Sequence, residues 1–599
     1  MSDAQAALRP IDNAGLAVRP GPVWAIAVAL ASGVAMTWEH AGDVWRTGAF
    51  YDTDDAMRMV QVRDLMAGQS WFDMVAHRMD PPAGVFMHWS RIVDVPLVLL
   101  MKLFGLFAAP AQAEAMTRLA FPFLLLVALY FVVARVASQF GDRATQMAAI
   151  GLTFATGPAV SQFVAGRIDH HAPQIVLLLA TTGVLLAAFD PRHGRRAWLA
   201  GLFVALSLAI SLENLPFFLV LCSAPVFAWI VRGDEQRAAM RSFSTGLGLS
   251  LGVAFVATVG PDRWSLVACD AYSVAHLAAG MAGAAAMFAL SIVSPRLANA
   301  RLRLVAAGVA GGFAVVVLRV TAPACLGDPF VGLDPLVRAI WLDHVGEAQK
   351  LFALVGTETT TAVTIGAPLA LAALASLTAT IAARGLLRAR FALLTALIVT
   401  GFVMTFWAVR VYSSAAPLAA IGGAAAAVML ARRLPVSPVL RAATTAMFCL
   451  PFAPMAYALV LPADPPTTDS YSLSCLRPEV VRPLDALPAG VVLAPIDAGS
   501  HLLAFTHHSA IAAPYHRDNH GNRLSVDAFM ATPEKAEEIV RRSHADYVVA
   551  CSALKQMHIM AEAAPNGLAA ALIAGRIPDW LEPVDAKAQP NAAFRVRPR

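Results

Sequence analysis

The sequence predicts a polytopic α-helical membrane protein with a small α/β domain at its C-terminal end. Of the 599 residues, 58% are hydrophobic and 14% are charged, and the mean hydropathy is +0.62. A soluble protein of this length could not bury so much apolar surface, so the composition excludes that class. The apolar residues gather in runs of roughly 16 to 22 residues, long enough to span or nearly span a bilayer. After residue 461 the pattern changes to short apolar strands and charged helices.

The topology follows from the apolar runs and from the basic residues between them. The positive-inside rule places the basic loops in the cytoplasm. If the run at 94–110 crossed the membrane, loop 191–196 would fall on the wrong side. We therefore expect this run, which contains Lys102, to lie in the interface or to re-enter, which leaves about 13 transmembrane helices. The runs start near residues 22, 94, 116, 144, 171, 196, 214, 244, 273, 302, 362, 388, 412 and 441, and the basic loops are 191–196, 231–241, 294–303, 383–390 and 431–441.

With this topology the N-terminus is cytoplasmic and the chain after Pro462 lies outside. Arg9 and Arg19 precede the first run, and no clear cleavage site follows it, so we expect a retained first helix. The net charge of +5 is modest, and we interpret the basic residues as topology determinants, with no nucleic acid as a partner. Four polar segments share the outer face, where we expect the chemistry: about 40–115, 166–174, 322–361 and the region from 462.

The C-terminal region differs in kind from the rest. We expect residues 1–461 to form the transmembrane domain and residues 462–599 an extracytoplasmic domain. Alternating strand and helix patterns indicate a small α/β domain. The predicted strands are 491–496, 509–516 and 546–552, and the predicted charged helix is 533–543.

The most informative polar stretch is 51–96, which directly follows the first apolar run. It begins with Asp52, Asp54 and Asp55. Clustered acids just beyond a membrane boundary favour binding of a divalent cation or a substrate. A solvated acidic turn is the alternative.

A second cluster, Asp169-His170-His171, stands at the outer start of an apolar run. An Asp and a His two positions apart in a loop can both face one ion. Together with Asp54 they would form a hard site suited to Mg²⁺ or Mn²⁺. The alternative is an interface turn that meets water, although consecutive ionisable residues there are costly unless they face a cavity.

Three further charges lie in or beside the outer segments. Glu347 and Glu358 both belong to segment 322–361, and either could complete the site, although an exposed loop acid is the commoner case. Arg410 stands between two apolar runs at the outer edge. A guanidinium at that depth can hold a phosphate through its fork of N–H donors, or it can simply extend to the interface.

Together these pieces resemble the catalytic subunit of oligosaccharyltransferases, a glycosyltransferase family with the GT-C fold. The order of the motifs, the number of spans and the large loop after the first span all match, over about residues 20–460. The matching segments are DDAMRMVQVRDLMAG (first acidic motif and helix), GRIDHHAPQ (archaeal-type second motif), GEAQ (the E-x-Q part of the fifth loop) and RVYSSAAPLAA (the R-F-x-x-x-x-x-P helix).

The resemblance implies a GT-C fold and inverting transfer of a sugar or oligosaccharide from a polyprenyl-phosphate or polyprenyl-diphosphate donor. It implies that Asp54, Asp169 and His171 bind the metal. Glu347 would support the metal and the acceptor, and Arg410 would contact the donor's phosphate. Asp54 or Glu347 would orient or deprotonate the acceptor, and the lipid would lie among the spans. We expect a bacterial inner membrane, with the active site on its periplasmic face. Additional candidates are Asp52, Asp55, His170 and Glu358.

One motif of the family is missing. Its soluble domain reads the Ser or Thr of a glycosylation sequon through WWDYG, and this sequence contains no WWD. Residues 507–523 form either an acceptor-binding loop, with His516, Arg517 and Asn519 as candidates, or a polar loop on a small domain. The acceptor is therefore a glycolipid, a polysaccharide or a protein. The alternatives are a GT-C transferase that modifies a glycolipid or polysaccharide, and a transporter of lipid-linked sugars.

The six cysteines are too few and too scattered for a disulfide scaffold. Cys269 and Cys325 both fall in outer loops, and Cys475 and Cys551 both fall in the C-terminal domain. Either pair is a candidate disulfide if the outer side is oxidising. Free thiols are the alternative.

Overall fold

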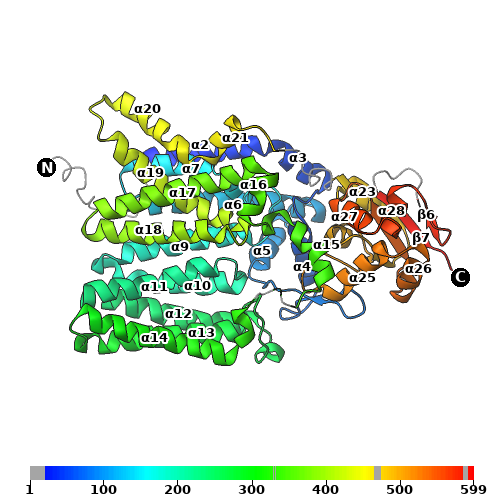
Figure 1. The fold of residues 1–599 in the computed structure, drawn as a ribbon, viewed down its shortest axis with the longest axis horizontal. Coiled ribbons are helices and arrows are strands. Elements are labelled where there is room, and N and C mark those ends of the chain that lie inside the picture. The colour runs from blue at the N-terminus through cyan, green and yellow to red at the C-terminus, as the bar shows by residue number, and fades with distance from the viewer. Residues whose placement is uncertain (1–19, 328–329, 331, 465–473, 585–590, 599) are drawn as a thin grey trace.

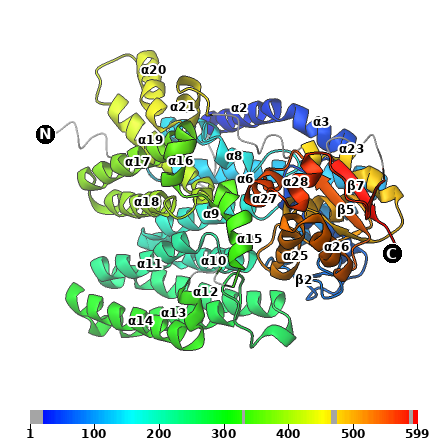
Figure 2. The same ribbon diagram turned by 45° about the vertical axis from the view of Figure 1, so that its right-hand side comes forward.

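The computed structural model describes residues 20–327, 330, 332–464, 474–584 and 591–598. A large helical bundle occupies one end of the elongated molecule, and a compact domain with a sheet occupies the other (Figure 1). The long helices run side by side along the bundle, and both views show them pointing towards the compact domain (Figures 1 and 2). The chain is thus an integral membrane protein with one polar end.

The bundle is built mainly from long helices whose apolar residues are distributed around the whole helix surface, as expected for spans that face lipid on one side and protein on the other. Its helices are α2 (Pro20–Met36), α3 (Trp38–Thr47), α6 (Pro110–Ala137), α7 (Arg143–Phe154), α8 (Pro158–Ser161), α9 (His171–Ala188), α10 (Trp198–Ile210), α11 (Leu215–Arg232), α12 (Arg237–Thr258), α13 (Val274–Val293), α14 (Ala300–Thr321), α16 (Leu351–Thr357), α17 (Thr359–Ala382), α18 (Gly385–Met404), α19 (Tyr412–Ala431), α20 (Pro438–Cys449) and α21 (Pro454–Val460).

Within the described residues, eight helical stretches are long and apolar enough to cross a membrane, or ten if the bent pairs α2–α3 and α20–α21 each count as one span. One of the eight, Leu215–Thr258, comprises α11 and α12. Helices α7 and α10, with 12 and 13 residues, fall short of that length. The expected number of about 13 spans therefore stays a prediction. The run at 94–110 forms α5 (Asp94–Phe104), whose 11 residues are not among the candidate spans.

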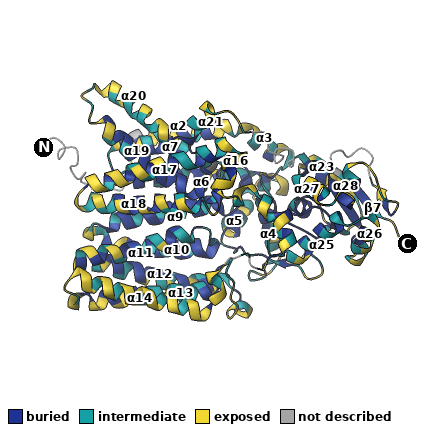
Figure 3. Ribbon diagram, in the orientation of Figure 1, coloured by how far each residue is buried: buried dark blue, intermediate teal, exposed yellow. Residues whose placement is uncertain are grey.

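Burial within the bundle rises from its rim to its centre (Figure 3). The span that contains α19 is 78% buried, whereas none of the span at α14 is buried inside the protein. Because α14 carries apolar side chains on every exposed side, lipid is the environment that its composition favours. Arg410 stands in the short 3-10 turn Val409–Val411 that leads into the buried helix α19.

The C-terminal domain is built around a five-stranded sheet with the order β4-β3-β5-β7-β6. Strands β4, β3 and β5 are parallel, and β7 and β6 continue the sheet antiparallel. The three predicted strands and the predicted charged helix correspond to β3, β4, β5 and α26, whereas β6 and β7 were not predicted. The elements are α23 (Pro478–Val481), β3 (Val491–Leu493), α24 (Gly499–Phe505), β4 (Ser509–Ala510), α25 (Asn519–Met530), α26 (Pro533–Arg542), β5 (Tyr547–Cys551), α27 (Lys555–Ala563), α28 (Leu568–Ile573), β6 (Leu581–Pro583) and β7 (Asn591–Val596).

The first loop packs into the C-terminal domain. It contains α4 (Thr53–Met66), the hairpin of β1 (Val75–Ala76) and β2 (Val85–Phe86), and α5. Met79 and Trp89 of this loop belong to the same buried apolar cluster as Val492 of the sheet. The Arg78 guanidinium donates to the carbonyls of Leu503, Thr506 and His508 at 2.7, 2.8 and 3.0 Å. These contacts hold the first loop, which contains α4, against the C-terminal domain.

Both predicted cysteine pairs are disulfides in the structure. The Cα atoms lie 5.0 Å apart in Cys269–Cys325 and 6.1 Å apart in Cys475–Cys551. The first disulfide joins the loop after α12 to the segment after α14. Cys222 and Cys449 are free.

We predict that replacing both Cys269 and Cys325 with serine lowers the free energy of unfolding by about 2–4 kcal/mol, because the crosslink restricts the unfolded chain. Thermal unfolding of the purified protein in detergent measures this change. Cys222→Ser is the matched control, since it removes a free thiol. An unchanged melting temperature in the double variant would show that this disulfide does not stabilise the fold.

Candidate metal centre

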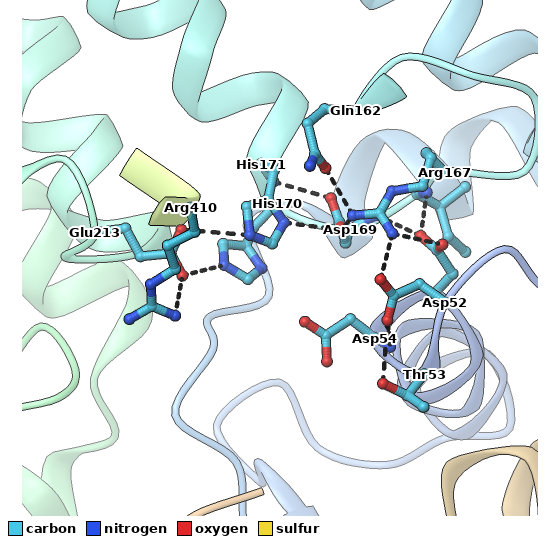
Figure 4. Close-up of polar contacts among 12 residues, drawn as sticks. Asp52, Thr53, Asp54, Gln162, Arg167, Asp169, His170, His171, Glu213 and Arg410 are labelled. Atoms are coloured by element: carbon cyan, nitrogen blue, oxygen red, sulfur yellow. Dashed lines mark hydrogen bonds and ion pairs between the residues drawn. The ribbon is translucent and has the colours of Figure 1, made fainter. Parts of the chain in front are cut away.

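The candidate site lies at the junction, where the start of α4 meets the turn 162–171, the break between α10 and α11, and the turn before α19 (Figure 4). Asp52 is the N-cap of α4, and its carboxylate accepts a hydrogen bond from the backbone N–H of Asp54 at 3.2 Å. Such a cap satisfies a free N–H of the first turn, and acids are also favoured there by the helix dipole. The sequence DTDD thus starts a helix and presents three carboxylates together.

Asp55 connects α4 to the second motif. Its buried carboxylate accepts the backbone N–H groups of Ile168 and Asp169 at 2.7 and 3.2 Å. The turn that carries Asp169 and His170 is therefore held against α4 by a side chain of the first acidic motif.

Arg167 is the central cation of this turn. It is almost fully buried. Its guanidinium donates hydrogen bonds to Asp52 and to Gln162, each at 2.7 Å, and forms an ion pair with Asp169. The carboxylate of Asp55 lies 3.4 Å from the same guanidinium. One guanidinium thus forms ion pairs with three carboxylates. Burial would raise the pKa of Asp169, but the charges of Arg167 and His171 hold it well below its usual range.

His171 is oriented by Asp169. The Asp169 carboxylate lies 2.9 Å from Nδ1 of His171, and it also accepts the backbone N–H of His171 at 3.0 Å. A carboxylate on one ring nitrogen fixes the imidazole and leaves the other nitrogen available to a metal, an arrangement common in metal sites. Nε2 of His171 lies 3.5 Å from a carboxylate oxygen of Glu213.

His170, His171 and Glu213 form the group that best fits a metal ion. One ligand atom from each lies within 4.8 Å of the others. His170 Nε2 is 3.5 Å from Glu213, and the two imidazole rings stack with centroids 4.4 Å apart. In the part of the chain that the structure describes, Nδ1 of His170 and Nε2 of His171 are buried without a hydrogen-bond partner. Burial lowers the pKa of His170, which favours the neutral imidazole that metals bind.

The charges around this group are unbalanced. The described residues bring together six carboxyl groups, from Asp52, Asp54, Asp55, Asp169, Glu213 and Glu347, and two guanidiniums, from Arg167 and Arg410. Buried charges need partners, because their desolvation is otherwise uncompensated. Burial alone would raise the pKa of Glu213, but His171 and Arg410 hold it well below its usual value. A divalent cation would offset the negative excess, so the residues present fit a metal.

The residues predicted as metal ligands are all at the junction, but the structure distributes their contacts differently. Asp169 is engaged by Arg167 and by Nδ1 of His171. The carboxylate of Asp54 points from α4 towards the histidine pair (Figure 4). The ligand-spaced group instead contains His170, which was only an additional candidate, and Glu213, which the sequence reasoning missed. The sequence feature that could have indicated Glu213 is its place as an acid in the short polar break SLEN between two apolar runs.

Arg410 and Glu347 lie at the edge of the same group. Nη1 of Arg410 is 3.4 Å from a carboxylate oxygen of Glu213. Glu347 is exposed, and its charge interacts with those of Arg410 and His171. Its segment is held beside Arg410 because the backbone N–H of Val409 donates to the carbonyl of Gln349 at 2.8 Å. Glu358, at the boundary between α16 and α17, makes no hydrogen bond or ion pair with the group among the described residues.

The predicted acceptor loop contacts the loop after α12 and segment 322–361. His516 Nε2 lies 2.6 Å from Asp270, and Arg517 donates to both oxygens of Asp270 at 2.7 Å. Asn519 accepts the backbone N–H of Asp334 at 2.8 Å and donates to the carbonyl of Gly332 at 3.2 Å. These three residues therefore anchor the C-terminal domain to the loop after α12 and to segment 322–361.

Tyr515, in the same loop, reaches the carboxylates. Its hydroxyl lies 3.3 Å from the Asp54 carboxylate and 3.2 Å from the Ser500 hydroxyl. Burial raises the pKa of Tyr515 well above its usual value, so the hydroxyl stays protonated and can donate to Asp54. The sequence did not single out this residue, because its contact to α4 spans more than 400 positions of the chain.

Comparison with solved structures identifies the architecture. Archaeal oligosaccharyltransferase AglB from Archaeoglobus fulgidus, in complex with an inhibitory peptide and a dolichol-phosphate, matches with a TM-score of 0.67 at 15% identity, over 92% of this chain and 72% of that chain. The chain has a GT-C fold. The GT-C architecture expected from the motifs is thereby confirmed, together with the small C-terminal sheet domain.

Two further AglB structures give the GT-C fold the same support. The form tethered to an acceptor peptide with the NVT sequon has a TM-score of 0.65 at 14% identity, over 96% of this chain and 74% of that one. The complex with Zn and sulfate has a TM-score of 0.61 at 15% identity, over 91% and 70%. No family model and no curated protein sequence matches this chain.

Proposed function

We propose that this GT-C protein is a metal-dependent, inverting glycosyltransferase. It moves a sugar or oligosaccharide from a polyprenyl-phosphate or polyprenyl-diphosphate donor to an acceptor at the outer, periplasmic face of a bacterial inner membrane. The observation that carries the proposal is the ligand-spaced group of His170, His171 and Glu213 next to Arg410, at the junction between an apolar bundle and a polar domain. The AglB structures with a dolichol-phosphate and with Zn and sulfate support it.

His170, His171 and Glu213 would hold the divalent cation, and Asp169 would fix the ring of His171. Bound there, the cation supplies Lewis-acid stabilisation of the charge on the departing phosphate. Two imidazoles make this site softer than the one expected from the sequence, so of the two predicted metals Mn²⁺ fits better than Mg²⁺.

The chain's own charged groups would divide the remaining work. Arg410, next to Glu213, would hold the donor phosphate through its N–H fork. Asp54 faces the histidine pair, and Tyr515 would hold its carboxylate in place through the 3.3 Å contact. Asp54 or the exposed Glu347 would take the proton of the acceptor as it attacks the sugar opposite the leaving group.

Removing divalent metal is expected to abolish transfer. Purified protein would be incubated with undecaprenyl-phosphate and undecaprenyl-diphosphate sugars and a lipid extract of the source cells, and consumption of the donor would be followed by mass spectrometry. We expect consumption to stop in EDTA and to return with Mn²⁺, more fully than with Mg²⁺.

Donor consumption that continues undiminished in EDTA would contradict the metal-dependent mechanism. Donor that crosses the membrane of proteoliposomes without any chemical change would instead identify a transporter of lipid-linked sugars.

A further inference from the structure

A cavity of about 70 Å³ opens between the first loop and the segment 258–273, with Arg517 of the C-terminal domain in its wall. Trp89 also lines this cavity. The Trp89 ring packs against His170 and Tyr515, with ring centroids 5.6 and 5.3 Å apart. One side chain thus separates the cavity from the metal centre. A cavity of this size accommodates one small group, not a whole sugar chain.

Two guanidiniums share one aromatic ring in the cavity wall. The Cζ atoms of Arg263 and Arg517 lie 3.6 and 5.6 Å from the centre of the Phe86 ring. The charge of Arg517 is matched by the two-pronged contact with Asp270. The guanidinium of Arg263, in contrast, makes no hydrogen bond or ion pair within the described ranges, and the neighbouring Asp262 is solvent-exposed. The cavity therefore has one cation that lacks an anionic partner.

The electrostatics of Arg263 favour an added anion. Burial and the nearby charge of Arg517 lower the pKa of Arg263, and the charge of the exposed Asp262 offsets them only in part. An anion bound beside Arg263 would remove this penalty, because its guanidinium can offer N–H donors to a carboxylate or phosphate. His88 and Ser90, which also line the cavity, carry buried polar atoms without a partner in the described chain.

The walls of the cavity are fixed before any ligand binds. Arg263 ends the 3-10 turn Pro261–Arg263, and the indole N–H of Trp264 donates to the Val259 carbonyl at 3.0 Å. The same loop is crosslinked through Cys269–Cys325, and the indole of Trp71 in the first loop donates to the Ala257 carbonyl at 2.6 Å. A preformed arrangement of this kind reduces the ordering cost of binding.

We propose that this cavity binds an anionic group, a phosphate or a carboxylate, carried by the acceptor. The inference rests on the proposed function, since the reacting centre would lie just beyond Trp89. Arg263 would be the residue that selects acceptors with a negative charge near the attacking hydroxyl. Neutral acceptors would leave Arg263 unpaired and would bind less well.

Calorimetric titration of the full-length protein in detergent with EDTA tests the site directly. The probes are inorganic phosphate, glucuronate and neutral glucose. The background is Arg410→Gln, because Arg410 is the proposed donor-phosphate anchor. We expect at least one anion to bind the R410Q protein at one site, at least about tenfold more weakly after Arg263→Gln is added, and glucose not to bind. Binding of phosphate alone would indicate a phosphorylated acceptor, and binding of glucuronate alone an acidic sugar.

Two further variants distinguish the loss of a binding site from misfolding of the protein. Arg263→Lys retains the charge and should restore part of the affinity, whereas Asp262→Asn, one residue away, should not weaken binding. Equal anion affinity with and without Arg263, or no anion binding to the R410Q protein, would overturn the proposal. This titration measures no sugar transfer, so its failure would leave the proposed function to be judged by donor consumption alone.

Discussion

Replacing Glu213 with glutamine is expected to reduce donor consumption by more than about 100-fold. Loss of even an outer-shell partner of a metal ligand costs about 10- to 100-fold, and Glu213 would be a ligand itself. The amide has nearly the shape of the carboxylate, but it removes the charge that balances the cation and Arg410. The sequence motifs did not predict Glu213 as a site residue. A large loss of activity in E213Q would therefore favour the ligand set given by the structure over the one predicted from the motifs.

Glu358→Gln is the matched control for this measurement. It is the same chemical change at an acid of segment 322–361, and within the described residues this acid makes no hydrogen bond or ion pair with the metal centre. We expect E358Q to keep wild-type activity. Donor consumption by the Asp169→Asn protein should lie between those of E213Q and E358Q, with a loss of about 10- to 100-fold. Asp169 would act on the metal only through His171. Wild-type activity in E213Q would remove Glu213 from the mechanism.

Replacing Arg167 with methionine is expected to lower the free energy of unfolding by about 3–5 kcal/mol, the range found when one partner of a buried ion pair is removed. Arg167 is almost fully buried and serves Asp52, Asp55 and Asp169. Methionine keeps much of the side-chain volume but leaves these carboxylates without their cation. Thermal unfolding in detergent, followed by intrinsic fluorescence, gives the change.

Arg192→Met provides the comparison for Arg167. Arg192 also pairs with an aspartate, Asp190, but its side chain is 79% exposed. Exposed pairs of this kind contribute about 0–1 kcal/mol, so the R192M protein should unfold near the wild-type temperature. If R167M unfolded at the same temperature as R192M, the contacts between Arg167 and the three carboxylates would not stabilise the fold.

Local sequence patterns predicted the elements whose formation depends on neighbouring residues in the chain. The sequence singled out Asp52, Asp54 and Asp55 as one acidic cluster, and the structure places them in the cap and first turn of α4. The charged segment 533–543 was predicted as a helix and forms α26, in which Pro533 stands in the first turn and Arg541 and Arg542 in the last, where these residues are favoured. The apolar runs likewise predicted a polytopic bundle, although not a confirmed number of spans.

Contacts between distant segments could not be predicted in this way. Glu213 has no sequence neighbour in the site, and only folding brings it to His170 and His171. The polar loop 507–523 suggested acceptor binding, but the structure pairs His516 and Arg517 with Asp270, nearly 250 residues away. A run of polar residues shows that partners are needed without indicating which ones.

The most direct test is the position of the metal in the full-length protein. Crystals soaked in Mn²⁺ would be measured at the manganese absorption edge to locate the ion by anomalous scattering. We expect one strong peak bounded by His170, His171 and Glu213, with Asp169 on the far side of the His171 ring. A peak held by Asp54 and Asp169 without His170 and Glu213, or no peak at the junction, would contradict this assignment.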